Sequence, residues 1–233
     1  MGLALCGAAS AAEISATVTG ITDYDFRGVS QTADDPAIQG SVDVSGESGW
    51  YAGIWASNVD FDDCCDESAE VDYYVGFTAG ETIEWDVGYV YYYYPSTDVD
   101  LNYPEVYIGG TYYGADEKWD IGLKQWASWD WFAYDDYGYY TELNVNYALP
   151  WWEIGVSGHY GYTFGSGPDD FTDESGLDEY ADWSLGINRS FGPVDAELRY
   201  VDTDLDGDLS VSSGAGTNDD RFIFSLSTTF PWD

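Results

Sequence analysis

The feature that most constrains the fold is a stretch of alternating residues between Ile83 and Pro95. Its first half reads Ile-Glu-Trp-Asp-Val-Gly-Tyr, so apolar or aromatic side chains take every second position and carboxylates or glycine lie between them. Successive side chains of a strand point to opposite faces, so this period of two predicts a β-strand with one oily and one polar face. The pattern returns along the whole chain, which is typical of a transmembrane β-barrel.

The alternation predicts about twelve strands, an even number that suits a single antiparallel up-and-down barrel. Clusters of Gly, Pro, Asp and Ser separate them. We therefore predict an all-β fold in which residues 13–233 form one membrane-spanning barrel. The expected strands cover residues 13–26, 36–46, 50–61, 69–79, 83–95, 103–113, 118–130, 137–149, 151–164, 179–191, 194–204 and 219–230.

The connections between these strands alternate in length. Short turns on one side and long loops on the other are expected of an outer-membrane barrel, whereas a soluble, secreted β-sandwich has no reason for this asymmetry. Short turns are expected near residues 47–49, 80–82, 114–117, 150 and 193, and longer, mostly acidic loops near 27–35, 62–68, 96–102, 131–136, 165–178 and 205–218.

Composition excludes several classes of function. The 233 residues include 44 acidic and 6 basic ones, for a formal net charge of −38. Phosphate binding needs a basic surface, so nucleic acid is not a partner, and docking on anionic lipid through a basic patch is disfavoured. No apolar run reaches the roughly 20 residues of a membrane helix. The 22 Tyr and 11 Trp suit the aromatic girdles of a membrane protein.

The first residues resemble the end of an export signal. Residues 1–12 finish on the small residues Ala9, Ser10, Ala11 and Ala12, which are typical of a signal-peptidase site. A positive segment before the apolar run is missing, so we interpret residues 1–12 as a signal-peptide remnant. Cleavage is expected near Ala12, followed by export to the bacterial outer membrane.

The basic residues test this register, because a charge on the lipid face costs about 2–4 kcal/mol at the bilayer midplane. Lys124, Arg199 and Arg221 fall on polar faces, and Arg27 and Lys118 fall at strand ends. Arg189 falls on an apolar face, but close to a turn, where its long side chain can reach the interface.

The first quarter of the chain carries a recognisable motif. Residues 20–31 read GITDYDFRGVSQ, residues 36–40 read PAIQG, and residues 49–59 read GWYAGIWASNV. This resembles the TorF family of porins, also called the Gcw_chp family, closely over residues 14–61 and by architecture beyond. The resemblance implies an outer-membrane channel without naming a solute. The motif positions are Asp23, Tyr24, Phe26, Arg27, Gly28, Ser30, Gln31, Gln39, Gly40, Trp55, Ser57 and Asn58.

If the oily faces meet lipid, the polar faces enclose an interior rich in carboxylates. Rings of carboxylates select cations, so we predict a channel for passive diffusion of small cationic or neutral solutes. About eight strands leave no pore whereas sixteen do, so a closed barrel that acts structurally, or as a surface-interaction protein through its acidic loops, is the alternative. The predicted pore-lining residues are Asp23, Asp25, Asp72, Glu84, Asp86, Glu142, Glu153, Asp195, Glu197 and Arg199.

Phe26 is predicted to end a strand, and Arg27 to open a loop among several carboxylates. Arg27 is expected to pair with Asp23, Asp25, Asp34 and Asp35 and so to tie a loop across the barrel mouth. The alternative is a purely structural loop.

Two further patterns are weaker. His159 shares a face with Ser157, as a barrel hydrolase would require, but nothing in the sequence places a third catalytic group, so we predict no enzyme and no cofactor. Asp202, Asp204 and Asp206 begin a D-x-D-x-D-G run, which suits Ca²⁺; the alternative is a solvated acidic loop.

The predicted partners are therefore outer-membrane lipid, small cationic or neutral solutes, Ca²⁺ in one loop, and further copies of the chain in an oligomer. The adjacent Cys64 and Cys65 are expected to be loop thiols or a strained vicinal bridge, because no further Cys or His lies nearby in the sequence to complete a metal site.

Overall fold

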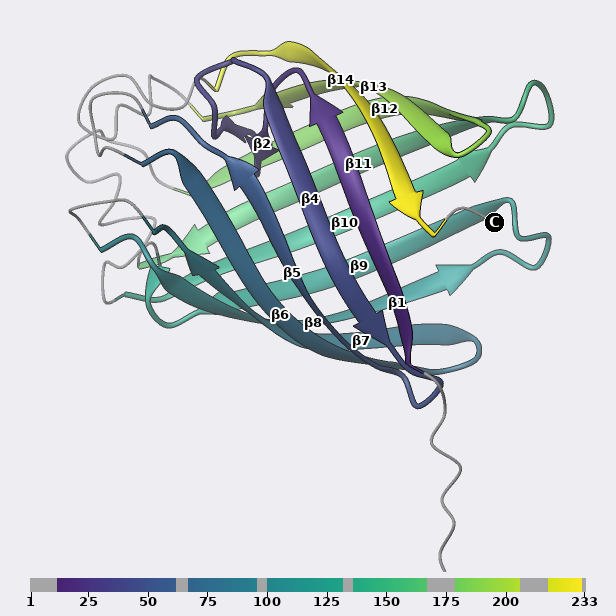
Figure 1. Ribbon diagram of the computed structural model, residues 1–233, viewed down its shortest axis with the longest axis horizontal. Helices are drawn as coiled ribbons and strands as arrows, with labels where there is room; N and C mark the ends of the chain where they lie inside the picture. The colour runs from purple at the N-terminus through teal and green to yellow at the C-terminus, as the bar shows by residue number, and fades with distance from the viewer. Residues whose placement is uncertain are drawn as a thin grey trace, which may run out of the picture.

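The computed structural model describes residues 12–61, 67–95, 100–131, 136–166, 179–205 and 218–231. Within these residues, twelve antiparallel strands close into one barrel, with β1 paired to β14 (Figure 1). The predicted all-β single barrel is confirmed. Its strands are β1 (Glu13–Ile21), β4 (Ala37–Ser45), β5 (Trp50–Asn58), β6 (Ala69–Ala79), β7 (Ile83–Tyr93), β8 (Tyr103–Tyr113), β9 (Trp119–Ser128), β10 (Gly138–Ala148), β11 (Ile154–Gly165), β12 (Tyr180–Phe191), β13 (Val194–Thr203) and β14 (Arg221–Phe230).

The oily faces of the strands point outward and the polar faces point inward, as predicted. Ile38 of β4 is 73% exposed, while the preceding Ala37 is 2% exposed. Leu185 of β12 is 68% exposed and the preceding Ser184 is 9% exposed. A soluble protein buries such side chains, whereas a membrane barrel exposes them to acyl chains. The described residues contain no helix long and apolar enough to cross a membrane.

Aromatic pairs occupy both ends of this outer surface. At the turn end, the Trp50 and Phe77 rings lie 5.2 Å apart, and Tyr112 and Trp119 lie 5.6 Å apart. At the loop end, Tyr139 pairs with Phe164 at 5.3 Å and Tyr200 with Phe222 at 5.2 Å. Such girdles lie at the two lipid–water boundaries of membrane barrels.

Arg189 keeps its predicted place on the outward face, near the β12–β13 turn. It is exposed, and its guanidinium lies 5.1 Å from the centre of the Phe191 ring. The charge therefore sits at the end of the lipid-facing surface, beside an aromatic ring, rather than at mid-height.

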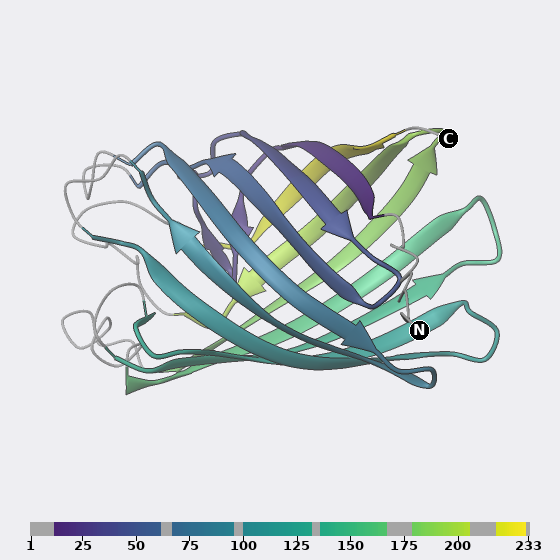
Figure 2. The ribbon, with the colours of Figure 1, turned by 60° about the horizontal axis from the view of Figure 1, so that its bottom comes forward.

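Tight turns gather at one end of the barrel, and the longer connections leave from the other (Figure 2). One turn is longer than predicted, because β11 begins at Ile154 rather than at residue 151. Glu153 therefore lies in the turn, exposed, with a φ of 53°. The prediction that Glu153 faces the interior is wrong, because the strand alternation had been extended into turn residues.

The first long connection folds into the barrel. β1 ends at Ile21, earlier than the predicted residue 26, and residues 22–36, which we call the plug, follow it. The plug carries two short strands, β2 (Asp25–Phe26) and β3 (Val29–Ser30), which pair as a hairpin on the inner side of the barrel (Figures 1 and 2). Alternation continues through Tyr24 and Phe26, which is why the sequence pattern predicted a longer strand; both rings instead pack inside the barrel.

Candidate functional site

The hairpin of the plug turns at Arg27 and Gly28. Both residues have a positive φ, 53° and 84°, as a two-residue type I′ turn requires. A Cβ added to Gly28 would lie 2.9 Å from the Cβ of Asp182 and 3.0 Å from that of Thr203. The tip of the plug is therefore pressed against the inner wall formed by β12 and β13, and only glycine fits at that contact.

Arg27 anchors the plug to the opposite wall. Its guanidinium donates two hydrogen bonds to the Glu105 carboxylate of β8, at 2.9 and 2.8 Å, and it also lies 4.3 Å from the centre of the Tyr140 ring. Arg27 is 8% exposed and Glu105 is fully buried. Burial by itself lowers the pKa of Arg27, but the Glu105 carboxylate outweighs it and the pKa is raised, so the guanidinium keeps its charge.

The predicted partners of Arg27 are wrong. Asp23 and Asp25 instead bind Arg221 of β14: its Nε contacts Asp23, and its Nη2 donates to Asp25 at 2.6 Å. Asp34 lies 3.8 Å from the same Nε. Arg221 is distant in sequence and becomes a neighbour of the plug only because β14 closes the barrel against β1.

The family motif lies partly in the plug and partly on β4 and β5, the strands that follow it. The Tyr24 ring meets Trp55 of β5 edge-on at 5.3 Å, and its hydroxyl donates to Glu70 at 2.9 Å. Burial raises the pKa of Tyr24, which keeps the phenol protonated as a donor. The Asn58 side chain donates to the Pro36 carbonyl at 3.3 Å and so fixes the end of the plug. These contacts give a structural reason for the motif.

The interior is filled unevenly. On the wall formed by β5 to β9, tyrosine rings lie flat over glycines of the neighbouring strands: Tyr51 over Gly76, Tyr107 over Gly88. The Tyr51 hydroxyl then reaches Asp86 of β7 at 2.6 Å. Nearer the loops, Tyr92 stacks on Tyr103 at 4.5 Å, and Phe26 of the plug packs against this cluster. Aromatic rings thus occupy this half of the lumen.

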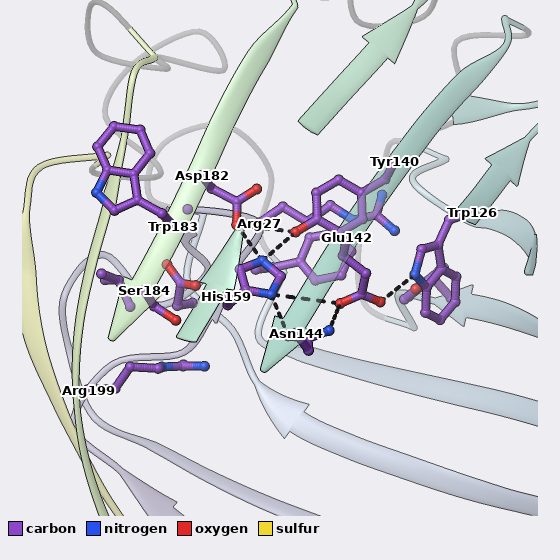
Figure 3. A pocket seen from close by; sticks show the side chains of 15 residues that line it. Arg27, Trp126, Tyr140, Glu142, Asn144, His159, Asp182, Trp183, Ser184 and Arg199 are labelled. Atoms are coloured by element: carbon purple, nitrogen blue, oxygen red, sulfur yellow. Dashed lines mark hydrogen bonds and ion pairs between the residues drawn. The ribbon is translucent and has the colours of Figure 1, made fainter. Parts of the chain in front are cut away.

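The wall formed by β10 to β13 instead carries mostly polar side chains and borders a cavity of about 320 Å³ (Figure 3). The plug forms its other side through Asp25 to Gly28. Beyond the cavity, exposure of the inward positions rises toward the turn end: Asp182 and Ser184 of β12 are buried, whereas Asn188 further along is exposed. The cavity therefore opens toward the turns and is covered by the plug on the loop side.

His159 lies at the centre of a hydrogen-bond network in this cavity. Its Nε2 lies 2.9 Å from both the Tyr140 hydroxyl and Asp182 Oδ1, and its Nδ1 lies 2.7 Å from Asn144 Oδ1. Glu142 accepts from Trp126 Nε1 at 2.8 Å beside it. Both ring nitrogens are thus engaged by groups other than Ser157, which is not the arrangement of a serine hydrolase.

Arg199 of β13 also borders the cavity. Its Nε is enclosed and has no hydrogen-bond partner within the described part of the chain. Asp182 also lines the cavity, and its Oδ2 is enclosed and has no hydrogen-bond partner among the described residues. Among the described residues that line the cavity, one enclosed donor and one enclosed acceptor therefore have no partner in the protein.

The remaining predicted lumen residues are spread over the inner wall rather than gathered in one ring. Asp72 is on β6, Glu84 and Asp86 are on β7, and Asp195 and Glu197 are on β13. Asp86 is paired with Lys124 at 3.0 Å, and Glu84 accepts from the Tyr113 hydroxyl at 3.1 Å near the turns.

Glu105, Glu70, Asn144 and Asp182 are polar lumen residues that were not among the predicted pore-lining residues. Each lies on the face opposite outward residues, as Glu105 does beside Val106, so the alternation itself could have identified them.

The predicted calcium run is only partly described. Asp204 Oδ1 accepts from the Ala181 amide at 2.6 Å, and Asp202 accepts from the Thr203 amide at 2.9 Å. Asp206, Cys64 and Cys65 lie outside the described residues. Among the residues that are described, no group of three His, Cys, Asp or Glu side chains is arranged to hold a metal ion.

Known structures share this fold. The NanC porin aligns with a TM-score of 0.61 at 11% identity, over 93% of this chain and 99% of that one. An outer membrane channel from Pseudomonas putida aligns with a TM-score of 0.52 at 11% identity, over 94% of each chain. No curated protein matches the sequence significantly.

A closed barrel with an oily outer surface, aromatic girdles and a polar interior defines an outer-membrane β-barrel protein. The chain matches Gcw_chp, described as a bacterial protein of unknown function, over residues 6–230. It belongs to that family and resides in the bacterial outer membrane.

Proposed function

We propose that this chain is a porin-like channel through which small solutes diffuse passively across the outer membrane. The observation that carries the proposal is the uneven filling of the lumen, with rings and plug on one side and a cavity bordered by polar side chains on the other. A structural barrel gains stability from a filled interior, whereas the wall from β10 to β13 leaves space next to polar groups. We also propose that the chain is a porin of the TorF type, as the motif of its first quarter suggests.

The plug sets the size of solute that we propose. It covers the cavity on the loop side and is held at two opposite walls by Glu105 and Arg221. A segment fixed by buried ion pairs narrows the passage, so the solutes are small.

The charge of the lining favours cationic or neutral solutes. Several inward carboxylates accept hydrogen bonds from neutral donors: Glu84 from Tyr113, Asp195 from Ser190, and Glu142 from Trp126 and Asn144. Carboxylates along an enclosed path attract cations through space. We propose that Asp23, Asp25, Asp72, Glu84, Asp86, Glu142, Asp195, Glu197 and Arg199 line or border this path.

Planar-bilayer recording of the refolded, purified chain tests the proposal. Discrete current steps are expected, with a reversal potential in a KCl gradient that shows cation preference. The double variant Glu84→Gln, Asp195→Asn should reduce that preference, whereas Glu153→Gln, in the exposed turn, should change it less. A preference for anions would contradict the charge argument.

The plug also supports a second function. A plugged barrel that acts structurally, or that binds partners at the cell surface through its acidic loops, explains the buried ion pairs of residues 22–36 equally well. The absence of any current from well-folded protein would favour this function over the channel. Oligomerisation, loop Ca²⁺ and removal of residues 1–12 stay predictions.

A further inference from the structure

The three arginines of the lumen differ in their hydrogen-bond partners. Arg27 is bound at both terminal nitrogens by Glu105, and Arg221 is bound by Asp23 and Asp25. The Nε of Arg199, in contrast, is enclosed without an acceptor in the described part of the structure. An enclosed N–H without an acceptor is costly in free energy, so Arg199 is better suited to a ligand than to holding the fold.

The same cavity contains an unused acceptor. Asp182 is 4% exposed, and its Oδ1 accepts from Tyr140 at 3.2 Å and is contacted by His159 Nε2 at 2.9 Å. Its Oδ2 is enclosed and unbonded within the described residues. Figure 3 shows Asp182, His159 and Glu142 grouped together, with Arg199 set apart from them on the other side of Ser184. Arg199 and Asp182 are thus separated from each other rather than paired.

We propose that this cavity binds a small zwitterion of the amino-acid type, with its carboxylate on Arg199 and its ammonium group on the side of Asp182 and Glu142. This rests on the proposed channel function and names its solute class. A simple anion satisfies Arg199 but meets two carboxylates, and a simple cation leaves the Arg199 Nε without an acceptor. A zwitterion pairs its carboxylate with Arg199 and its ammonium group with the carboxylates, and it has no net charge.

The dimensions and walls of the cavity fit such a ligand. Its volume of about 320 Å³ is at the lower end of small-molecule sites, so it suits a single amino acid rather than a peptide. Trp126 lines it, and its indole N–H donates to Glu142, which places one fluorophore beside the bound solute. Its opening toward the turn end gives a route of entry that does not require the plug to move.

Binding is measured on the refolded full chain in detergent, by tryptophan fluorescence and calorimetry, with L-alanine as the zwitterion and propionate and ethylamine as singly charged probes. We expect saturable binding of L-alanine, at least about tenfold tighter than either probe, because charge-assisted bonds are made at both ends. Equal binding of propionate and L-alanine would overturn the zwitterion assignment, as would the absence of binding by L-alanine.

Variants locate the site. Arg199→Met should weaken L-alanine binding about tenfold or more, with partial recovery in Arg199→Lys. Arg189→Met is the matched control, because that arginine lies on the outer surface, and it should bind as the native chain does. Retained heat-modifiable gel mobility shows that each barrel is folded; unchanged binding in folded Arg199→Met would overturn the assignment.

L-alanine binding is measured in detergent, independently of transport. The channel function and the zwitterion site can therefore be rejected independently of each other. Current without L-alanine binding would reject the solute and leave the channel. Binding without current would reject the channel and leave the site.

Discussion

The Arg27 guanidinium and the Glu105 carboxylate form a two-bond ion pair inside the barrel, with N–O distances of 2.9 and 2.8 Å. The pair joins the plug to β8, and the Tyr92 hydroxyl donates to the same carboxylate at 2.9 Å. Since both charges are buried, each depends on the other, and the position of the plug depends on both.

Glu105→Gln should destabilise the plug, because it leaves the Arg27 charge buried without its counter-ion. The expected loss is about 3–5 kcal/mol, measured as the shift in urea unfolding of the barrel in lipid vesicles. In bilayers, the released plug should increase single-channel conductance. Glu84→Gln removes a carboxylate near the turns and serves as control. If Arg27→Met combined with Glu105→Gln is no more stable than Glu105→Gln alone, the pair is not coupled as described.

Arg221→Met should loosen the other side of the plug, and more so at high pH. Burial raises the pKa of Asp25, while Arg221 and Arg199 lower it, so loss of Arg221 raises it further. A raised carboxyl pKa means that the folded state binds the proton more tightly, so stability falls as pH rises through that pKa. The loss in unfolding free energy should therefore be larger at about pH 8 than at about pH 5. An equal loss at both pH values, or the same effect in Arg189→Met, would contradict this role.

Gly28→Ala should displace the plug tip from the barrel wall. The substitution combines a left-handed backbone with a Cβ placed against Asp182 and Thr203, and we expect a cost of about 1–3 kcal/mol. Gly192→Ala is the matched control, since Gly192 also has a positive φ, 64°, but has open space around it. The difference between the two variants in urea unfolding reports the packing alone; no difference would mean that the tip does not touch the wall.

Gly88→Ala should disturb the aromatic half of the lumen, because the added methyl group meets the ring of Tyr107 directly opposite. Overpacking of this kind costs about 1–3 kcal/mol. Gly20→Ala, with open space around it, should be near neutral. Adding Tyr107→Leu to Gly88→Ala should restore part of the loss, and a failure of this rescue would show that the ring is not the cause.

The lumen chemistry was only partly accessible from sequence. Alternation correctly assigned the inward faces of Asp72, Asp86 and Arg199, because neighbouring strand positions must point to opposite sides. It assigned no partners: the pairing of Asp86 with Lys124, two strands away, depends on the curvature that brings side chains together across the inner wall. Glu153 was misplaced because alternation carries no information about where a strand begins.

By itself, the sequence determined the barrel: its number of strands, its oily exterior and the side on which its turns are short. These features follow from the local alternation of side chains, because one face of each strand contacts lipid and the other faces the aqueous interior. Only the tertiary structure decided that residues 22–36 turn inward. Their alternation continues that of β1. Glu105 and Arg221 hold them inside the barrel, and these two residues lie far along the chain and reach the plug only once the barrel has closed.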